Sequence, residues 1–400
     1  MFEADDNSRA LPAAQLLPLI VSQLKFYGYT AAAKFVADTT EVSSTFEPSA
    51  RLAELCFLGR QAKEAMGGAE EDLLAPAESL EPAGGAPGDE LGALAIDPAA
   101  PAAYSADGKL AATGSQDTTI KILDAHRIAT QLGDSAEDRK VLRTLYDHQD
   151  AINDLAFHPN GFVLASGADD CQIKLFDMQK THVKRGFRYL SDAYPVRSIA
   201  FHPSGDFLLS GTDHHAVRIY DVHTLKCFTP QNQADHHRAG ILKVAYAPTG
   251  GVFASASADG DIRLYDTVSG RCINTIAGAH GGRPVTSVAF SKNSKYLLSM
   301  GMDSVGRLWD MGSGKTLVTY QGSLQSSEKT GFVFNHNEDF VFGADAANSC
   351  LVVWDSRSGT LLRRFSGHGK PVLAIAASPT DNCLITGSED TRARVWGSRE

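Results

Sequence analysis

The stretch Val285–Asp310, VTSVAFSKNSKYLLSMGMDSVGRLWD, carries the pattern that decides the fold. Apolar and polar residues alternate along Val285–Phe290, as in a strand with one buried face, and a polar turn follows. Tyr296–Met300 has the composition of a second strand and Gly306–Trp309 that of a third. A tight turn containing Asp303 separates these two strands. The stretch therefore predicts a small antiparallel sheet.

The same pattern recurs along the chain. The residues that close its copies are Asp124, Asp177, Asp221, Asp266, Asp310, Asp355 and Gly397. Successive copies lie 53, 44, 45, 44, 45 and 42 residues apart, close to the roughly 40–45 residues of a WD repeat. One such sheet cannot bury both of its faces, so the repeats stack around an axis. We predict an all-β seven-bladed WD-repeat β-propeller over residues 91–400, preceded by a small α-helical dimerisation domain.

The two ends of the propeller are expected to share one sheet. Only four residues follow Trp396, so the seventh blade needs its fourth strand from elsewhere, and we expect Leu91–Ile96 to supply it. Ala99–Tyr104 should open the first blade, although Pro101 makes it a weak strand. His126–Lys140 lengthens the first spacing and is expected to form an exposed loop.

The composition is that of a folded soluble protein, with 43% hydrophobic and 21% charged residues. Apolar runs are all shorter than the roughly 20 residues of a membrane span, so no membrane association is expected. The first ten residues, MFEADDNSRA, do not resemble a signal peptide, which favours the cytoplasm or nucleus. The six cysteines are scattered without a CxxC pair, so neither zinc nor another cofactor is expected.

Acidic residues are concentrated near the N-terminus. Residues 1–98 hold 16 acidic and 6 basic residues, and the remainder holds 31 of each, so the predicted propeller is neutral. Binding of nucleic acid in bulk requires a basic surface that neutralises phosphates. We therefore expect protein partners, with RNA contact limited to a local basic patch.

Residues 10–66 are expected to form three short helices. An apolar stripe at helical spacing, followed by a Gly-Tyr pair, is similar to the LisH dimerisation motif. Helices this short bury little core alone, which favours a homodimer over the alternative of a cap on the propeller of the same chain. The residues expected at the dimer interface are Leu16, Leu17, Ile20, Leu24 and Tyr29. Residues 67–90, rich in Ala, Pro, Gly and Glu, are expected to form a flexible linker.

Several blades carry a His and an Asp at matching positions. The pairs are His148 with Asp170, His236 or His237 with Asp259, His280 with Asp303, and His368 with Asp390. One such set could suggest nucleophilic catalysis, but an enzyme needs one site and not four. In WD repeats these side chains form a buried hydrogen-bond network that holds the blade, so no enzyme activity is expected. We assign this structural role to Asp117, His148, Asp170, Asp259, His280, Asp303, Trp309, His368, Asp390 and Trp396.

Two blades depart from this regular pattern. Blade three has His214 where its turn Asp should be, and blade six, FGADAANSCLVVWD, has neither the leading His nor a clear turn Asp. Sequence drift and a surface shaped for a partner both explain such departures.

The segment KRGFRY interleaves cations with aromatic side chains. It can contact RNA or an acidic peptide, or it is a solvated blade edge. Its candidate contact residues are Lys184, Arg185, Phe187, Arg188 and Tyr189.

Some segments are more specific than a general WD repeat. They are RTLYDH (143–148), LAFHP (155–159), KLFD (174–177), RSIAFHPSGDF (197–207), FSKNSKY (290–296) and RARVW (392–396). With the N-terminal motif, they resemble the WD-repeat subunit of the cleavage stimulation factor. The resemblance implies a nuclear, non-catalytic scaffold in pre-mRNA 3′-end cleavage and polyadenylation. It also implies a homodimer whose propeller holds a helical-repeat scaffold subunit, while a separate RNA-recognition subunit makes most of the RNA contact.

A second functional hypothesis comes from blade six. Its sequence Trp354-Asp355-Ser356-Arg357 matches the WDxR box through which some WD proteins contact a ligase adaptor. The alternative function is therefore a substrate receptor of a cullin-type ubiquitin ligase. The motif is only four residues long, and its Arg could simply brace the end of a strand.

Overall fold

A computed structural model gives the fold of the propeller region. It describes residues 89–95, 99–125, 141–180, 182, 184–326 and 331–397. The predicted helices at 10–66, nearly all of the predicted linker and the predicted loop at 126–140 lie outside the described residues. The described chain forms seven four-stranded sheets, as the spacing of the repeats predicts.

Each sheet is one blade, and its strands run antiparallel from an inner to an outer position. Blade one contains β2 (Ala99–Tyr104), β3 (Leu110–Ser115), β4 (Thr119–Asp124) and β5 (Val141–Tyr146). Blade two contains β6 (Ile152–Phe157), β7 (Val163–Ala168), β8 (Gln172–Asp177) and β9 (Arg188–Ser191). Blade three contains β10 (Val196–Phe201), β11 (Phe207–Thr212), β12 (Arg218–Asp221) and β13 (Cys227–Phe228). A short 3₁₀ helix, Gln233–Asp235, precedes blade four.

The other blades follow the same plan. Blade four contains β14 (Ile241–Tyr246), β15 (Val252–Ser257), β16 (Ile262–Asp266) and β17 (Cys272–Ile276). Blade five contains β18 (Val285–Phe290), β19 (Tyr296–Gly301), β20 (Gly306–Asp310) and β21 (Thr316–Tyr320). Blade six contains β22 (Phe332–Phe334), β23 (Phe340–Asp345), β24 (Cys350–Asp355) and β25 (Leu361–Ser366). Blade seven contains β26 (Val372–Ala377), β27 (Leu384–Ser388), β28 (Arg392–Gly397) and β1 (Asp89–Ala95).

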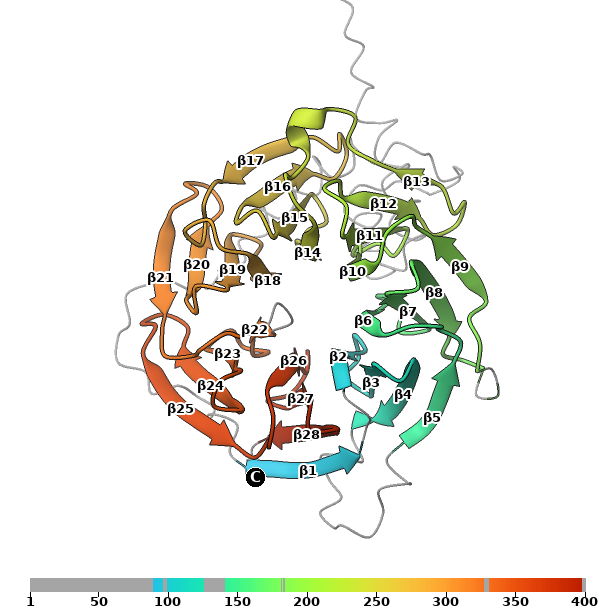
Figure 1. The fold of residues 1–400 in the computed structure, drawn as a ribbon, viewed down its shortest axis with the longest axis vertical. Helices are drawn as coiled ribbons and strands as arrows, with labels where there is room; N and C mark the ends of the chain where they lie inside the picture. The colour runs from blue at the N-terminus through green and yellow to red at the C-terminus, as the bar shows by residue number, and fades with distance from the viewer. Residues whose placement is uncertain are drawn as a thin grey trace, which may run out of the picture. The chain divides into compact units, whose positions relative to one another are not determined.

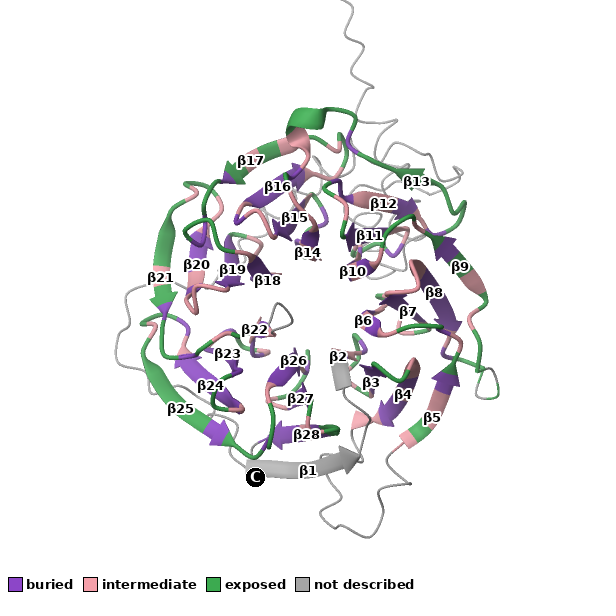
Figure 2. Cartoon of the chain, in the orientation of Figure 1, coloured by how far each residue is buried: buried purple, intermediate pink, exposed green. Residues whose placement is uncertain are grey.

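The blades form a closed ring around one axis (Figure 1). Each inner strand lies next to the inner strand of the following blade, and β26 returns to contact β2. Figure 2 shows the buried residues concentrated on the inner and middle strands and the exposed ones on outer strands such as β21 and β25. The fold is thus a seven-bladed WD40 β-propeller.

The ring closes through strand exchange between the two ends of the described chain. β1 pairs antiparallel with β28, with Glu90 opposite Trp396 and Ala95 opposite Arg392. The strand begins two residues before the predicted Leu91–Ile96, whereas β2 has the predicted bounds. The pairing of β2 with β3 is irregular between Ala99 and Ala102, around Pro101, whose nitrogen cannot donate a hydrogen bond.

The core consists of apolar side chains packed between neighbouring sheets. In β19, Leu298 clusters with Trp354 of blade six, whereas Leu297 clusters with Leu264 of blade four. Successive side chains of one strand therefore pack against the two different blades on either side. Both faces of a blade are buried in this way, so both are apolar.

The two FHP motifs lock adjacent blades together. His158 of blade two donates from Nε2 to the carbonyl of Gly205 in blade three, at 3.1 Å. His202 makes the same bond to Gly250 of blade four, also at 3.1 Å. A Cβ at position 205 would lie 2.2 Å from His158 Nε2, so the ring can approach only because that residue is glycine. Burial lowers the pKa of both histidines, and each ring is accordingly held in its neutral form.

Candidate binding surfaces of the propeller

The blade networks bring together His and Asp residues that are 22 or 23 positions apart in sequence. The Nδ1–carboxylate distances are 2.8 Å for His148–Asp170, 3.0 Å for His237–Asp259, 2.8 Å for His280–Asp303 and 2.8 Å for His368–Asp390. A carboxylate only accepts, so Nδ1 donates and Nε2 is left to accept from a hydroxyl. The hydroxyl partners are Ser166, Ser255, Ser299 and Thr386. In blade four the partner is His237, whereas His236 donates to Pro230.

Two blades extend this network to a tryptophan. The indole Nε1 of Trp309 donates to Ser299 at 2.8 Å, and that of Trp396 donates to Thr386 at 2.8 Å. In blade one, Asp117 accepts from the backbone and hydroxyl of Thr119.

The four paired histidines are buried, and their Asp partners are partly covered. Burial raises the pKa of Asp303, but the hydrogen bond and charge of His280, followed by Arg307, outweigh it and lower that pKa to about 2. Burial lowers the pKa of His280, whose ring is fully covered. A covered ring whose two nitrogens are both hydrogen-bonded within the blade holds the blade together.

Blade three keeps its turn with a histidine in place of the aspartate. The backbone N–H of Ala216 donates to Nδ1 of His214 at 3.2 Å. In blade four, Asp259 accepts the matching bond from the N–H of Asp261 at 3.0 Å. His214 therefore replaces the turn carboxylate as the acceptor of this backbone hydrogen bond, which it can accept only while its ring is neutral.

Blade six has a different pair in place of the His–Asp network. Its Asp345 is fully buried and accepts from Arg364 Nη1 at 2.7 Å and from Asn348 Nδ2 at 2.8 Å. Sequence reasoning missed this pair. Trp354 of the same blade is buried and donates to the carbonyl of Gln321 at 2.8 Å, so the Trp of the WDxR sequence is a core residue.

A polar network across three blades lines the inner side of the ring. The buried carboxylate of Asp154 in β6 accepts from Ser198 Oγ of β10 at 2.7 Å and from Lys243 Nζ of β14 at 2.8 Å. The same carboxylate accepts the backbone N–H of Ile199 at 3.0 Å. Sequence reasoning missed this network too, since Asp154 and Lys243 are 89 residues apart.

The predicted basic and aromatic segment lies at the outer boundary of blades one and two, where β5 and β9 are neighbours (Figure 1). Backbone bonds fix it in place, because Tyr146 donates to the carbonyl of Lys184 at 3.1 Å and Phe187 to that of Leu175 at 2.8 Å. We use the term basic edge for Tyr146, Lys184, Arg185, Phe187 and Tyr189.

Arg188 does not belong to this exposed set, although the sequence predicts it there. Its Nη1 donates to the carbonyl of Val222 in blade three at 2.5 Å. Arg143 of blade one makes the corresponding bond to the carbonyl of Met178 in blade two at 3.0 Å. Arginines of two successive outer strands thus join blade one to blade two and blade two to blade three.

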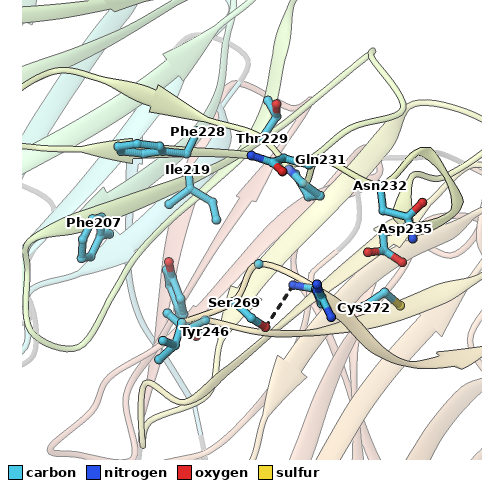
Figure 3. Close-up of a pocket in the computed structure, with 15 residues that line it drawn as sticks. Phe207, Ile219, Phe228, Thr229, Gln231, Asn232, Asp235, Tyr246, Ser269 and Cys272 are labelled. Atoms are coloured by element: carbon cyan, nitrogen blue, oxygen red, sulfur yellow. Dashed lines mark hydrogen bonds between the residues drawn. The ribbon is translucent and has the colours of Figure 1, made fainter. Parts of the chain in front are cut away.

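A groove of about 990 Å³ lies between the outer parts of blades three and four (Figure 3). Its apolar lining includes Phe207 and Ile219 of blade three and Tyr246 of blade four. The exposed side chains of Phe228 and Val268 also line it. The buried hydroxyl of Tyr246 finds no hydrogen-bond partner among the described residues. Apolar area beside hydrogen-bonding groups is the combination found in protein–protein interfaces.

Metal sites and membrane-spanning helices are absent from the same described ranges. No group of three or more His, Cys, Asp or Glu side chains is placed there to hold a metal ion. None of the helices there has the length and apolarity to span a bilayer. The predicted dimer-interface residues Leu16, Leu17, Ile20, Leu24 and Tyr29 lie outside these ranges.

Comparison with known proteins adds independent findings. A family model described as WD domain, G-beta repeat, matches residues 100–124, 139–177, 188–221, 228–266, 270–310 and 359–397. Strands β22, β23 and β24 of the divergent blade six fall outside these matches.

Curated relatives give a closer likeness. Cleavage stimulation factor subunit 50 of Arabidopsis thaliana is 41% identical over 297 residues, which covers 74% of this chain and 69% of the relative. Nuclear distribution protein PAC1 of Arthroderma otae is 29% identical over 269 residues, which covers 64% of this chain and 51% of that relative.

A solved structure supports the architecture. The β-propeller domain of Myceliophteria thermophila Cps50 (Swd1) matches with a TM-score of 0.65 and 16% identity, over 77% of this chain and 98% of that chain. At this identity the likeness shows the fold alone.

Proposed function

The chain belongs to the cleavage stimulation factor subunit 50 family of WD40 proteins, and from this premise we propose that it is a nuclear scaffold subunit in pre-mRNA 3′-end cleavage and polyadenylation. Members of this family are non-catalytic. The 41% identity over 74% of the chain carries the proposal. The His–Asp networks support a scaffold, because each histidine is buried and its ring nitrogens are hydrogen-bonded within the blade.

The proposed assembly has three parts. The N-terminal helices join two copies of the chain, and the propeller binds a helical-repeat scaffold subunit. A separate RNA-recognition subunit carries most of the RNA contact, which agrees with a propeller whose acidic and basic residues balance. The groove between blades three and four and the exposed outer strands supply apolar area for protein contacts.

Native mass spectrometry of affinity-purified protein from nuclear extract tests the assembly. We expect a dimer of this chain with the helical-repeat and RNA-recognition subunits. A dimer-interface variant, Leu16→Asp with Ile20→Asp, should give a monomer that still recovers the helical-repeat subunit.

Two outcomes would contradict the proposal. Recovery of a ligase adaptor without the processing subunits would replace it by the ubiquitin-ligase hypothesis. A dimer that survives the double Asp variant would place the dimer contact elsewhere in the chain. The matched control is Leu73→Asp with Leu74→Asp in the predicted linker, which should leave the dimer intact.

A further inference from the structure

The basic edge exposes three aromatic side chains close together. Tyr146 is 54% exposed, Phe187 is 48% and Tyr189 is 45%. Burying such rings would gain free energy, so a group of them left half in solvent on a well-anchored segment indicates a binding surface. The anchors are the backbone bonds that join this segment to both blades.

Cations are held over these rings. Lys184 Nζ lies 5.8 Å from the centroid of Tyr146, Lys174 Nζ lies 5.5 Å from that of Tyr189, and Cζ of Arg188, which is tied to Val222, lies 6.0 Å from that of Phe187. Lys174 is buried and already donates to the carbonyl of Asp147 at 2.5 Å. Exposed Lys184 and Arg185 therefore remain as the cations of the edge that a ligand can reach.

Among the described residues, the carboxylate of Asp147 contacts this segment, and its bonds lie within it. Asp147 accepts from the backbone N–H of Gly186 at 2.8 Å and from the Tyr189 hydroxyl at 3.0 Å, and Lys174 lies 3.9 Å away. The positive charge of Lys174 and the two donors therefore face this carboxylate from within the segment. The solvent-facing side of the edge is cationic and aromatic.

We propose that the basic edge binds single-stranded RNA, with Lys184 and Arg185 on phosphates and the exposed rings stacked on bases. The two exposed cations favour an anionic ligand. The exposed aromatic rings favour RNA over an acidic peptide. An acidic peptide would use the two cations, but its carboxylates have no aromatic face to stack on three rings, whereas every base has one. The choice of RNA as the available nucleic acid rests on the proposed function.

The size of the effect follows from the number of cations. Two phosphate contacts on a single strand give a slope of about −1.4 in a plot of log affinity against log salt concentration. Loss of one stacking ring should weaken binding by about tenfold without changing that slope. The two contributions can therefore be measured separately.

Fluorescence anisotropy of the full-length protein with a labelled U-rich single strand of about 20 nucleotides tests the inference, at salt concentrations between about 50 and 200 mM. Lys184→Ala with Arg185→Ala should make the slope shallower by about 1.4. Phe187→Ala should reduce affinity by about tenfold at constant slope. The control is Lys226→Ala with Lys315→Ala, which removes two exposed cations from blades three and five and should change neither quantity.

Several results would overturn the inference. They are no RNA binding by the unaltered protein, a Lys184/Arg185 variant that behaves like the control, and a Glu-rich peptide that needs Lys184 and Arg185 while RNA does not. Co-purification from nuclear extract separates this question from the assembly. Failure of the unaltered protein to recover the processing subunits would contradict the proposed function, and the anisotropy would still report on the edge.

Discussion

Arg364 of β25 donates to the fully buried carboxylate of Asp345 at the end of β23, with 2.7 Å between Nη1 and Oδ2. The same guanidinium also donates to the carbonyl of Gly322. This pair holds blade six, which lacks a His–Asp network. A buried carboxylate without such a partner would be strongly unfavourable, so blade six has a substitute for the usual network rather than a defect.

Replacing Arg364 should therefore destabilise the propeller. Arg364→Met leaves the buried carboxylate of Asp345 with only its neutral partner Asn348 and should lower the free energy of unfolding by about 3 kcal/mol, measured by urea denaturation. Arg357→Ala, at an exposed position of the same blade, removes the same charge and should change it by less than about 0.5 kcal/mol. Equal effects of the two variants would show that the ion pair does not support the blade.

Gly205 should tolerate no side chain. Gly205→Ala combines a φ of +88° with a Cβ 2.2 Å from His158 Nε2. Gly161→Ala is the matched control, because its φ of +75° brings the same backbone strain and its Cβ meets nothing within 4 Å. We expect a loss of about 1–2 kcal/mol for the control and about 2 kcal/mol more for Gly205→Ala, seen as a lower thermal midpoint. Equal midpoints would show that the contact between blades two and three gives way easily.

His214 should make blade three sensitive to acid. Burial, followed by the charges of His215, Arg218 and His236, lowers the pKa of His214 below its usual 6.5. The unfolded chain then binds more protons below pH 6.5 than the folded one, so stability falls as pH drops through that value.

An asparagine at this position removes the titration and keeps the acceptor. His214→Asn should therefore reduce the loss of stability between about pH 7.5 and pH 5.5, measured by urea denaturation at each pH. His182→Asn, at an exposed position, is the control and should leave the pH dependence unchanged. An unaltered pH dependence in both variants would assign the acid sensitivity to other histidines.

The pairing of β1 with β28 should be needed for a stable ring. Ala93→Pro with Leu94→Pro removes two successive N–H groups, one of which must face β28 because alternate residues of a strand bond to opposite sides. We expect a loss of about 3 kcal/mol or more in calorimetry. Ala83→Pro with Ala86→Pro, in the predicted linker, should have little effect. An unshifted transition in the β1 variant would mean that blade seven is stable with three strands.

The sequence predicted those features that repeat. The period of the closing aspartates gave seven blades, and the missing fourth strand after Trp396 gave the exchange with β1. Contacts that occur once were not predictable in this way. Asp345 and Arg364 lie on strands that are not adjacent, and Asp154 and Lys243 meet only because the ring brings β6 and β14 together.

Two contacts between blades differ in whether the sequence indicates them. The FHP motif occurs twice, each time 47 or 48 residues before a glycine with positive φ in the next blade, and this repetition could have indicated the contact. Arg188 is different, because its sequence neighbours Lys184 and Arg185 are exposed and only the fold shows that it is tied to Val222.

The pairing of Glu90 with Trp396 has a consequence for biosynthesis. The two partners are separated by about 300 residues, so at about 5–20 residues per second a ribosome needs some 15–60 seconds to make the second after the first. Throughout that time β1 is a strand without its neighbour, able to pair with the edge of another nascent chain. Chaperones that shield the growing polypeptide would therefore matter most for this segment, and translation speed should influence the yield of native protein.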